Sequence, residues 1–340
     1  MKIGKRSLLL LLLLLLLTGC GTKKVEEKKT IKIGVTLYDQ YDAYIAALTN
    51  KFKEYATAKS TETGKTINVE IMNAAGSQST QNKQVKSMIN SGYDVICVNL
   101  VDRTDPSVII DTAKENDIPI IFFNRELVEE DLERFEKLYY VGARAFESGI
   151  MEGELVVEYF AKHPEMDRNE DGLLQYMVLE GEAGHQDAIV RTEYSTSTIE
   201  GHEIGLEKLD YSIANWSRDQ AKTKVLQILS QEEFPELIIS NNDYMALGAI
   251  DAYETNYIEK RLWPVIFGID GIKEGLEAVK QGKMAATVYN DKEGQAKAML
   301  DLAYLIAMDQ DLSECNLEHG KYIRLPYTKI TPENVEEFMD

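Results

Sequence analysis

A short segment near the middle of the chain brings three chemically versatile side chains together. The segment GEAGHQDAIVR, residues 181–191, contains His185, Asp187 and Arg191, and it follows a strand-like run, LLQYMVLE. Carboxylate and guanidinium groups each present two polar atoms in one plane, so they suit neighbouring hydroxyl groups of a ligand. His185 and Asp187 could alternatively cap the helix that follows. The spacing therefore predicts either a ligand-binding edge or an ordinary helix start.

Planar polar side chains follow four other strand-like runs. DVICV is followed by Asn99, ELIIS leads into Asn242, VIFGI is followed by Asp270, and ATVY by Asn290. In open α/β sheets the ligand crevice lies outside the carboxyl ends of the strands. A single Asn in such a place commonly makes a turn or a helix cap. Four of them after four strands are expected to converge on one crevice.

The ligand class follows from what accompanies these groups. No G-x-G-x-x-G or G-x-x-x-x-G-K-[ST] loop is present, which argues against a nucleotide. A sugar hydroxyl both donates and accepts hydrogen bonds, and the apolar faces of a sugar ring pack on aromatic rings. Tyr44, after the first strand-like run, and Trp216, after LDYSIA, are candidate rings, although a Trp beside a helix start is often a core residue.

Composition limits the architecture and the partners. The chain has 340 residues, 44% of them hydrophobic, with only 7 Pro and 22 Gly, so it can bury a large core, as two lobes. Its formal net charge of −20 repels nucleic acid and anionic lipid surfaces. We therefore expect a neutral or cationic small ligand and no nucleic-acid partner.

The elements that must position these side chains alternate along the chain. Such alternation predicts an α/β fold with parallel sheets covered on both faces by helices. The expected strands are IKIGVTL, INVEIM, DVICVN, IPIIFF, LLQYMVL, LDYSIA, ELIIS, VIFGI and ATVY. The expected helices include residues 44–59, 81–91, 146–163, 219–230, 244–256 and 292–308.

The first thirty residues carry a targeting signal. MKIGKR is positively charged, residues 8–17 form an apolar run too short to span a bilayer as a helix, and Leu17-Thr18-Gly19-Cys20 resembles the bacterial lipobox. We expect residues 1–19 to be a cleaved signal peptide, Cys20 to be lipidated, and residues 20–30 to be a tether. The mature protein would then be extracytoplasmic, anchored to the outer face of the cell membrane or periplasmic. Ordinary secretory cleavage beside an incidental Cys is the alternative.

Together these segments give the chain a specific likeness. It resembles the periplasmic D-galactose/D-glucose-binding proteins of bacterial ABC importers over nearly all of residues 31–338. The matching stretches are IGVTLYDQYDAYI, VNLVD, IPIIFFNRE, YYVGA, DRNEDGLLQ, GEAGHQDAIVRT, SNNDYMALGA, FGIDGIKE and TVYNDKEGQAKAM. The resemblance implies a two-lobe fold joined by a three-strand hinge, and a protein that binds a sugar without transforming it.

The resemblance also implies a role for each candidate residue. Asp42 would be the carboxylate that accepts either epimer at the hydroxyl distinguishing glucose from galactose, and Tyr44 and Trp216 would stack on the sugar. The better-known family members have Phe at the position of Tyr44, so the extra hydroxyl needs a partner or solvent. The other implied polar ligands are Asn99, His185, Asp187, Arg191, Asn242, Asp270 and Asn290.

A second cluster of polar residues follows the spacing of a calcium loop. Asp167, Asn169 and Asp171 occupy positions 1, 3 and 5 of D-x-[DN]-x-[DN]-G, the carbonyl of Leu173 would serve at position 7, and Gln175 stands at position 9. Position 12 is Val178, so an ordinary EF-hand is excluded. The family closes this loop with a distant glutamate, which Glu236 matches. We expect one structural Ca²⁺ remote from the sugar; a solvated acidic turn is the alternative.

Domain boundaries and partners follow from the same likeness. It implies a first lobe of residues 31–118 and 290–325 and a second lobe of residues 119–289 and 326–340. The crossings would lie near residues 116–123, 289–290 and 325–327. A ligand that contacts both lobes favours the closed form, so hinge closure is expected. The closed monomer would dock on an ABC permease. A chemoreceptor is a further partner that the resemblance allows.

Other function classes are weaker. Asp187 and Asp270 could act as the acid and base of a glycoside hydrolase, but Arg191 lies four residues from Asp187 and should keep it ionised. A sugar-responsive repressor would need a basic DNA-reading segment, and the chain has an acidic composition and a signal peptide instead. A binding protein for another monosaccharide, or a sensor for a chemoreceptor, remains the nearest alternative.

Overall fold

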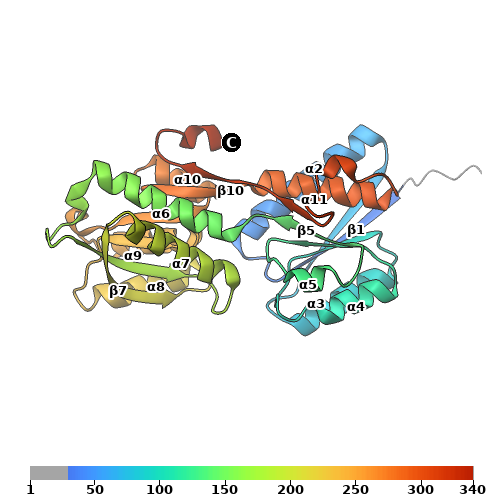
Figure 1. The fold of residues 1–340 in the computed structure, drawn as a ribbon, viewed down its shortest axis with the longest axis horizontal. Coiled ribbons are helices and arrows are strands. Elements are labelled where there is room, and N and C mark those ends of the chain that lie inside the picture. Colours follow the sequence, from blue (N-terminus) through green and yellow to red (C-terminus); the bar gives the residue numbers. More distant parts are fainter. Residues whose placement is uncertain (1–29, 340) are drawn as a thin grey trace, which may run out of the picture.

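The computed structural model describes residues 30–339 as two α/β lobes placed side by side (Figure 1). Each lobe is built around one six-stranded sheet. The predicted signal peptide, Cys20 and all of the predicted tether except Thr30 lie outside the described residues. Within residues 30–339, no helix is both long and apolar enough to cross a membrane.

The first lobe contains a fully parallel sheet. Its strand order is β11-β5-β4-β3-β1-β2, and the order reverses at β1, which lies between β2 and β3. The strands are β1 (Thr30–Leu37), β2 (Thr66–Asn73), β3 (Val95–Val98), β4 (Ile120–Phe123), β5 (Leu138–Gly142) and β11 (Tyr322–Arg324). The helices are α2 (Ala43–Thr63), α3 (Gln78–Asn90), α4 (Ser107–Glu115), α5 (Glu129–Leu132) and α11 (Lys292–Ala307).

The second lobe repeats this plan with one antiparallel edge. Its order is β12-β10-β9-β8-β6-β7, and only β12 runs against its neighbour. The strands are β6 (Leu173–Glu180), β7 (Gly205–Ile213), β8 (Leu237–Ser240), β9 (Val265–Asp270), β10 (Ala286–Asn290) and β12 (Tyr327–Ile330). The helices are α6 (Ala145–Lys162), α7 (Gln186–Gly201), α8 (Arg218–Leu229), α9 (Asp243–Thr255) and α10 (Lys273–Lys280).

The central strands are buried on both faces, which explains their unbroken apolar sequences. All four residues of β3, of β4 and of β8 are buried. In β4, Ile121 and Phe123 pack in one hydrophobic cluster while Ile120 and Phe122 pack in another, on the opposite face. Such double burial is typical of parallel sheets between helices and confirms the predicted fold class.

The chain crosses between the lobes three times. It leaves the first sheet after β5, returns after β10 and crosses again between β11 and β12 (Figure 1). The boundary predicted at residues 118 and 119 is wrong, because β4 and β5 both pair within the first sheet. The first lobe therefore extends to β5, and the first crossing lies between Gly142 and Ala145. The short strand β5, LYYVG, follows a charged segment and was not recognised from the sequence.

Candidate functional site

A small cavity lies between the lobes, at the carboxyl ends of strands from both sheets. It is lined by Tyr38, Asp42, Tyr44, Ile45, Asn124 and Arg125 from the first lobe and by His185, Asp187, Arg191, Trp216, Asn242 and Asp270 from the second. Its volume is about 30 Å³. That is about the space of one water molecule. The lining side chains therefore leave little free space between the lobes in this structure.

The structure brings together eight of the ten residues predicted for the sugar site. All but Asn99 and Asn290 line the cavity. These two are buried elsewhere: the Asn99 side chain donates to the Phe123 carbonyl at 3.2 Å and to Asn124 Oδ1 at 3.1 Å. Asn290 Oδ1 accepts from Gln295 Nε2 at 2.6 Å. Neither side chain lines the cavity in this structure, and both are buried among protein groups.

Three polar lining residues were not predicted from the sequence: Tyr38, Asn124 and Arg125. Asn124 follows β4 directly and lies at the cavity edge, while Asn99 supports it from the neighbouring strand. A signal was available, since Asn124 also follows an apolar strand run, IPIIFF. The rule that located Asn242 and Asp270 would have located Asn124 as well.

His185 both caps a helix and faces the cavity. Its Nδ1 accepts from the backbone N–H of Asp187 at 3.1 Å, at the start of α7. Because Nδ1 acts as an acceptor, the proton of the neutral ring lies on Nε2, which remains free to donate. Burial and then the charges of Arg125, Arg191 and Arg103 hold the pKa of His185 well below its ordinary value. His185 therefore caps the helix, as one reading of the opening segment expects, and also lines the cavity, as the other reading requires.

Arg191 is the buried cation of the site. Its Nη1 donates to the Asn241 carbonyl at 2.7 Å and lies 3.7 Å from Asp270 Oδ1. Burial alone would lower the pKa of Arg191, but Tyr327, Asp270 and Asp187 raise it above its usual value. Its Nε has no hydrogen-bond partner among the described residues. The guanidinium is therefore permanently charged, and its Nε–H is available to donate a hydrogen bond to a ligand.

The two carboxylates beside Arg191 are strongly affected by burial. Burial raises the pKa of Asp187 and raises that of Asp270 well above the ordinary value, and Arg191 offsets this only in part. At Asp187, removal of water therefore outweighs the charge of Arg191, and the pKa of this carboxyl shifts upward. Asp270 also has a φ of 117°. Such backbone strain is often found at binding sites.

Trp216 is held by an unusual backbone. Asn215 and Trp216 have φ values of 50° and 60°, a left-handed conformation that bulky residues rarely adopt. The ring lies against Gly181, where an added Cβ would come within 2.2 Å of the indole. It also meets the His185 ring edge to face at 5.2 Å. The turn after β6 and the turn after β7 therefore fix this aromatic wall together.

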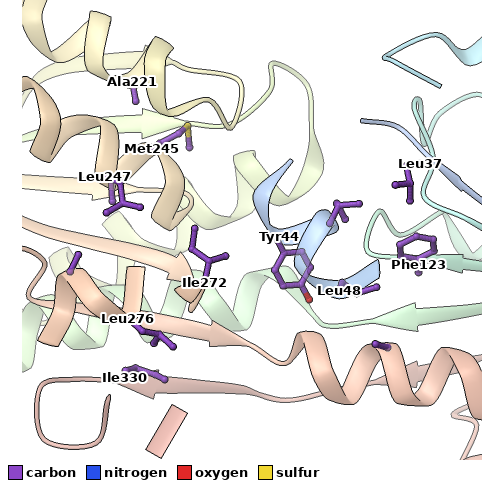
Figure 2. Close-up of a cluster of buried hydrophobic side chains, with 14 of the residues drawn as sticks. Leu37, Tyr44, Leu48, Phe123, Ala221, Met245, Leu247, Ile272, Leu276 and Ile330 are labelled. Atoms are coloured by element: carbon purple, nitrogen blue, oxygen red, sulfur yellow. The ribbon is translucent and has the colours of Figure 1, made fainter. Parts of the chain in front are cut away.

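The first lobe contributes Asp42 and Tyr44 from the start of α2. Asp42 Oδ1 caps that helix by accepting from the Ile45 N–H at 2.9 Å, and its Oδ2 accepts from the Tyr38 hydroxyl at 2.5 Å. Figure 2 shows the Tyr44 ring between Leu48 of its own helix and Ile272 of the second lobe. The Tyr44 hydroxyl is buried without a hydrogen-bond partner among the described residues. The predicted need of this hydroxyl for a partner is therefore unmet here.

The predicted calcium loop lies at the opposite end of the second lobe's strand β6. Glu236 joins its two ends, accepting from the backbone N–H of Arg168 at 2.6 Å and of Gln175 at 3.2 Å. Asp171 Oδ2 accepts from the amides of Asn169 and Gln175 at 2.9 and 3.1 Å. Asp167 Oδ1 is buried and has no partner among the described residues.

This arrangement is compatible with a hard cation but does not form a finished cage. Across residues 30–339, no three His, Cys, Asp or Glu side chains gather closely enough to hold a metal ion. The loop's oxygen donors also include an Asn, a Gln and the Leu173 carbonyl. Rotation of the Asn169 and Gln175 amides would exchange nitrogen for oxygen and present oxygen ligands beside the unpaired Asp167 atom. The donor set therefore fits Ca²⁺.

Comparisons with known proteins agree with this architecture. The family described as periplasmic binding protein domain matches residues 33–311. The D-galactose/methyl-galactoside binding periplasmic protein of Haemophilus influenzae is 33% identical over 312 residues, covering 91% of this chain and 92% of that protein. The xylitol-binding protein of Mycolicibacterium smegmatis is 29% identical over 300 residues, covering 87% of this chain and 78% of that protein.

Solved structures show the same fold. An ABC transporter solute binding protein from Bacillus halodurans, with bound myo-inositol, superimposes with a TM-score of 0.76 at 28% identity. The match covers 92% of this chain and 98% of that one. The similar proteins are thus named for different polyhydroxylated ligands, while the two-lobe scaffold is shared.

Proposed function

Because the chain belongs to the periplasmic binding protein domain family, we propose that it captures D-galactose, D-glucose or both between its lobes and delivers the sugar to an ABC permease. Members of this family work outside the cytoplasm. The relatives are named as binding proteins, so the chain is a solute carrier rather than an enzyme. The observation that carries the proposal is one cavity lined by flat polar groups and aromatic rings from both lobes.

The polar groups suit the chemistry of a hexose. Asp187 and Asp270 can accept hydrogen bonds from sugar hydroxyls, and Arg191 Nε and His185 Nε2 can donate to the same hydroxyls. Asn242 uses its Oδ1 to cap α9, accepting from Met245 N–H at 2.9 Å, which leaves its amide N–H groups available. A hydroxylated ring could therefore find both donors and acceptors around its edge, as recognition of a sugar requires.

Capture would couple to hinge closure. The cavity is lined by side chains from both lobes, and three chain crossings connect these lobes. A ligand that touches both walls stabilises the closed state through contacts that the open state lacks. The permease would then recognise the closed protein, because only that form presents both lobe surfaces in a fixed relation.

Three further elements complete the proposal. Ca²⁺ at Asp167, Asn169, Asp171, Leu173, Gln175 and Glu236 would join the start of β6 to the residue before β8 and stabilise the second lobe. Lipidation at Cys20 would hold the mature protein at the outer face of the membrane. A chemoreceptor that reads the closed form would be an additional partner. None of these elements is needed for sugar binding itself.

Isothermal titration of the mature protein with D-galactose, D-glucose, pentoses, xylitol and myo-inositol tests the proposal. We expect saturable binding of at least one of the two hexoses, tighter than any pentose or polyol. Binding of a polyol with no response to either hexose would contradict the proposed substrate while leaving the carrier function intact. Turnover of aryl glycosides would contradict the carrier function.

A further inference from the structure

One ion pair crosses the cleft next to the sugar cavity. Arg125, which follows β4 in the first lobe, donates from Nη2 to Glu182 Oε2 at 2.7 Å, and Glu182 follows β6 in the second lobe. Arg125 is only 4% exposed, whereas the Glu182 side chain is 45% exposed. The pair therefore consists of a buried cation and an anion at the cleft rim.

The buried guanidinium is fixed from the first-lobe side. Its Nη1 donates to the Val101 carbonyl at 2.8 Å, and its central carbon lies 3.7 Å from the centre of the Tyr38 ring. Stacking of a guanidinium on an aromatic face orients it at little entropic cost. Arg125 is thus held ready by its own lobe, and Glu182 reaches it only when the second lobe is near.

Tyr38 connects this pair to the sugar site. The ring that supports Arg125 carries the hydroxyl that donates to Asp42 Oδ2 at 2.5 Å. Asp42 is the carboxylate proposed to accept either hexose epimer. Tyr38 and Asp42 line both the closed cavity and the adjoining open groove of about 600 Å³, and Glu182 lines the groove. A continuous chain of contacts therefore runs from Glu182 through Arg125 and Tyr38 to Asp42.

We propose that Arg125 is a positioning residue that couples lobe closure to the sugar site: Glu182 engages it across the cleft only in the closed form, and Tyr38 transmits its position to Asp42. This inference rests on the proposed sugar-binding function. Separation of the lobes breaks the Arg125–Glu182 contact and returns both groups to water, so the pair favours closure. The favourable contribution is limited by the exposure of Glu182 to solvent.

Glu182→Gln tests the cross-cleft contact with minimal change of shape. We expect hexose affinity to fall about fivefold, because the closed state loses a charge-assisted hydrogen bond to a buried cation. The matched control is Asp117→Asn, which removes a 2.7 Å pair with Lys137 inside the first lobe. Equal affinities for wild type and Glu182→Gln, or an equal loss in the control, would overturn the proposal.

A double-mutant cycle with Arg125→Met shows whether the two residues act together. The Met side chain retains part of the packing on Tyr38 but cannot pair with Glu182. We expect the double variant to bind hexose no more weakly than Arg125→Met alone, because the contact can be lost only once. If the double variant instead lost affinity by the product of the two single-variant factors, the two residues would be acting independently. Wild-type affinity should also weaken with added salt more than that of Glu182→Gln.

Small-angle X-ray scattering separates this inference from the sugar proposal. Without any ligand, Glu182→Gln should have a larger radius of gyration than wild type, because the closed population falls. This comparison remains informative even if no hexose binds. The closure role would be overturned if wild type and Glu182→Gln scattered identically both without ligand and with saturating hexose.

Tyr38→Phe tests transmission to Asp42. The variant keeps the aromatic face under Arg125 and removes only the hydroxyl that holds Asp42 Oδ2. We expect the ratio of galactose to glucose affinity to change by about threefold or more while unliganded scattering stays as in wild type. An unchanged ratio would show that Tyr38 does not orient Asp42.

Discussion

The interlobe cavity and the loop of residues 167–175 use similar side chains in opposite ways. Cavity residues come from strand ends far apart in the sequence, and they keep unused capacity: Arg191 Nε, Arg125 Nε and the Tyr44 hydroxyl have no partner among the described residues. Loop residues are neighbours, and their amides and carboxylates satisfy one another, with Asp167 Oδ1 as the exception. The contrast is that the cavity keeps several unpaired polar groups where distant strand ends converge, whereas the loop pairs most of its own groups.

The largest expected effect is the loss of hexose binding in Asp187→Ala. The substitution removes an acceptor and leaves the buried Arg191 without one of its two neighbouring carboxylates. We expect the affinity to weaken by about 2 kcal/mol or more, which is about thirtyfold. Titration with the preferred hexose measures the effect. As a control, the increase in unfolding temperature caused by Ca²⁺ should be the same in the variant as in wild type. An unchanged affinity would contradict the proposed site.

Glu236→Gln should weaken the calcium loop and leave hexose affinity unchanged. Both carboxylate oxygens accept backbone N–H groups, and the residue is 2% exposed. Since an amide offers only one acceptor oxygen, we expect a loss of about 1–2 kcal/mol in the free energy of unfolding and a smaller stabilisation by Ca²⁺. Urea unfolding with Ca²⁺ or a chelator gives the measurement. Loss of hexose affinity without loss of stability would break the distinction between the two regions.

The cavity should also respond to pH. Among its carboxyl groups, Asp187 and Asp270 have raised pKa values, so they take up protons at higher pH than ordinary carboxyl groups do. A protonated carboxyl accepts fewer sugar hydroxyls, so hexose affinity should rise with pH, being about threefold weaker at about pH 5 than at about pH 7.5. Titrations across this range test the direction of the effect.

The raised pKa of Asp270 has the opposite effect on the stability of the unliganded protein, which should fall as the pH rises. A carboxyl group whose pKa is higher in the folded state stabilises folding at low pH, and this contribution is lost as the pH rises through the folded pKa. Relative to Asp270→Asn, wild type should therefore lose stability as the pH rises. A difference between the two proteins that stays constant with pH would show that Asp270 does not titrate in this way.

The smallest expected effect belongs to Tyr44→Phe. The hydroxyl that this change removes is buried without a described partner, so its loss should leave the free energy of unfolding unchanged or raise it by less than about 1 kcal/mol. Hexose affinity should stay within about twofold of wild type. A large loss of affinity would instead identify the Tyr44 hydroxyl as a sugar ligand.

Much of the architecture was predictable because strands buried on both faces leave a strong apolar signal. All nine strands expected from the sequence correspond to strands of the structure. The short strands β5, β11 and β12 were not recognised. Each has five residues or fewer. Missing β5 displaced the first lobe boundary, because that strand keeps the chain in the first sheet until Gly142.

The position of a residue after a strand identified many of the side chains that line the cavity, but it did not distinguish lining residues from their buried neighbours. Asn99 and Asn124 both follow strands of one sheet, yet Asn99 points inward to hold Asn124. Nothing in the order of residues distinguishes these two orientations. Likewise, the pairing of Arg125 with Glu182 depends on the distance between lobes, which no local pattern encodes.

The third crossing has a consequence for biosynthesis. The first lobe's sheet ends with β11, residues 322–324, and α11 packs on α2 across more than two hundred intervening residues. A growing polypeptide cannot complete that lobe until almost its whole length has emerged from the ribosome. The edge of β5 stays open until β11, near the end of the chain, has been made. A nascent chain of this topology therefore stays incompletely folded throughout translation, which is the condition that passage through a narrow export channel requires.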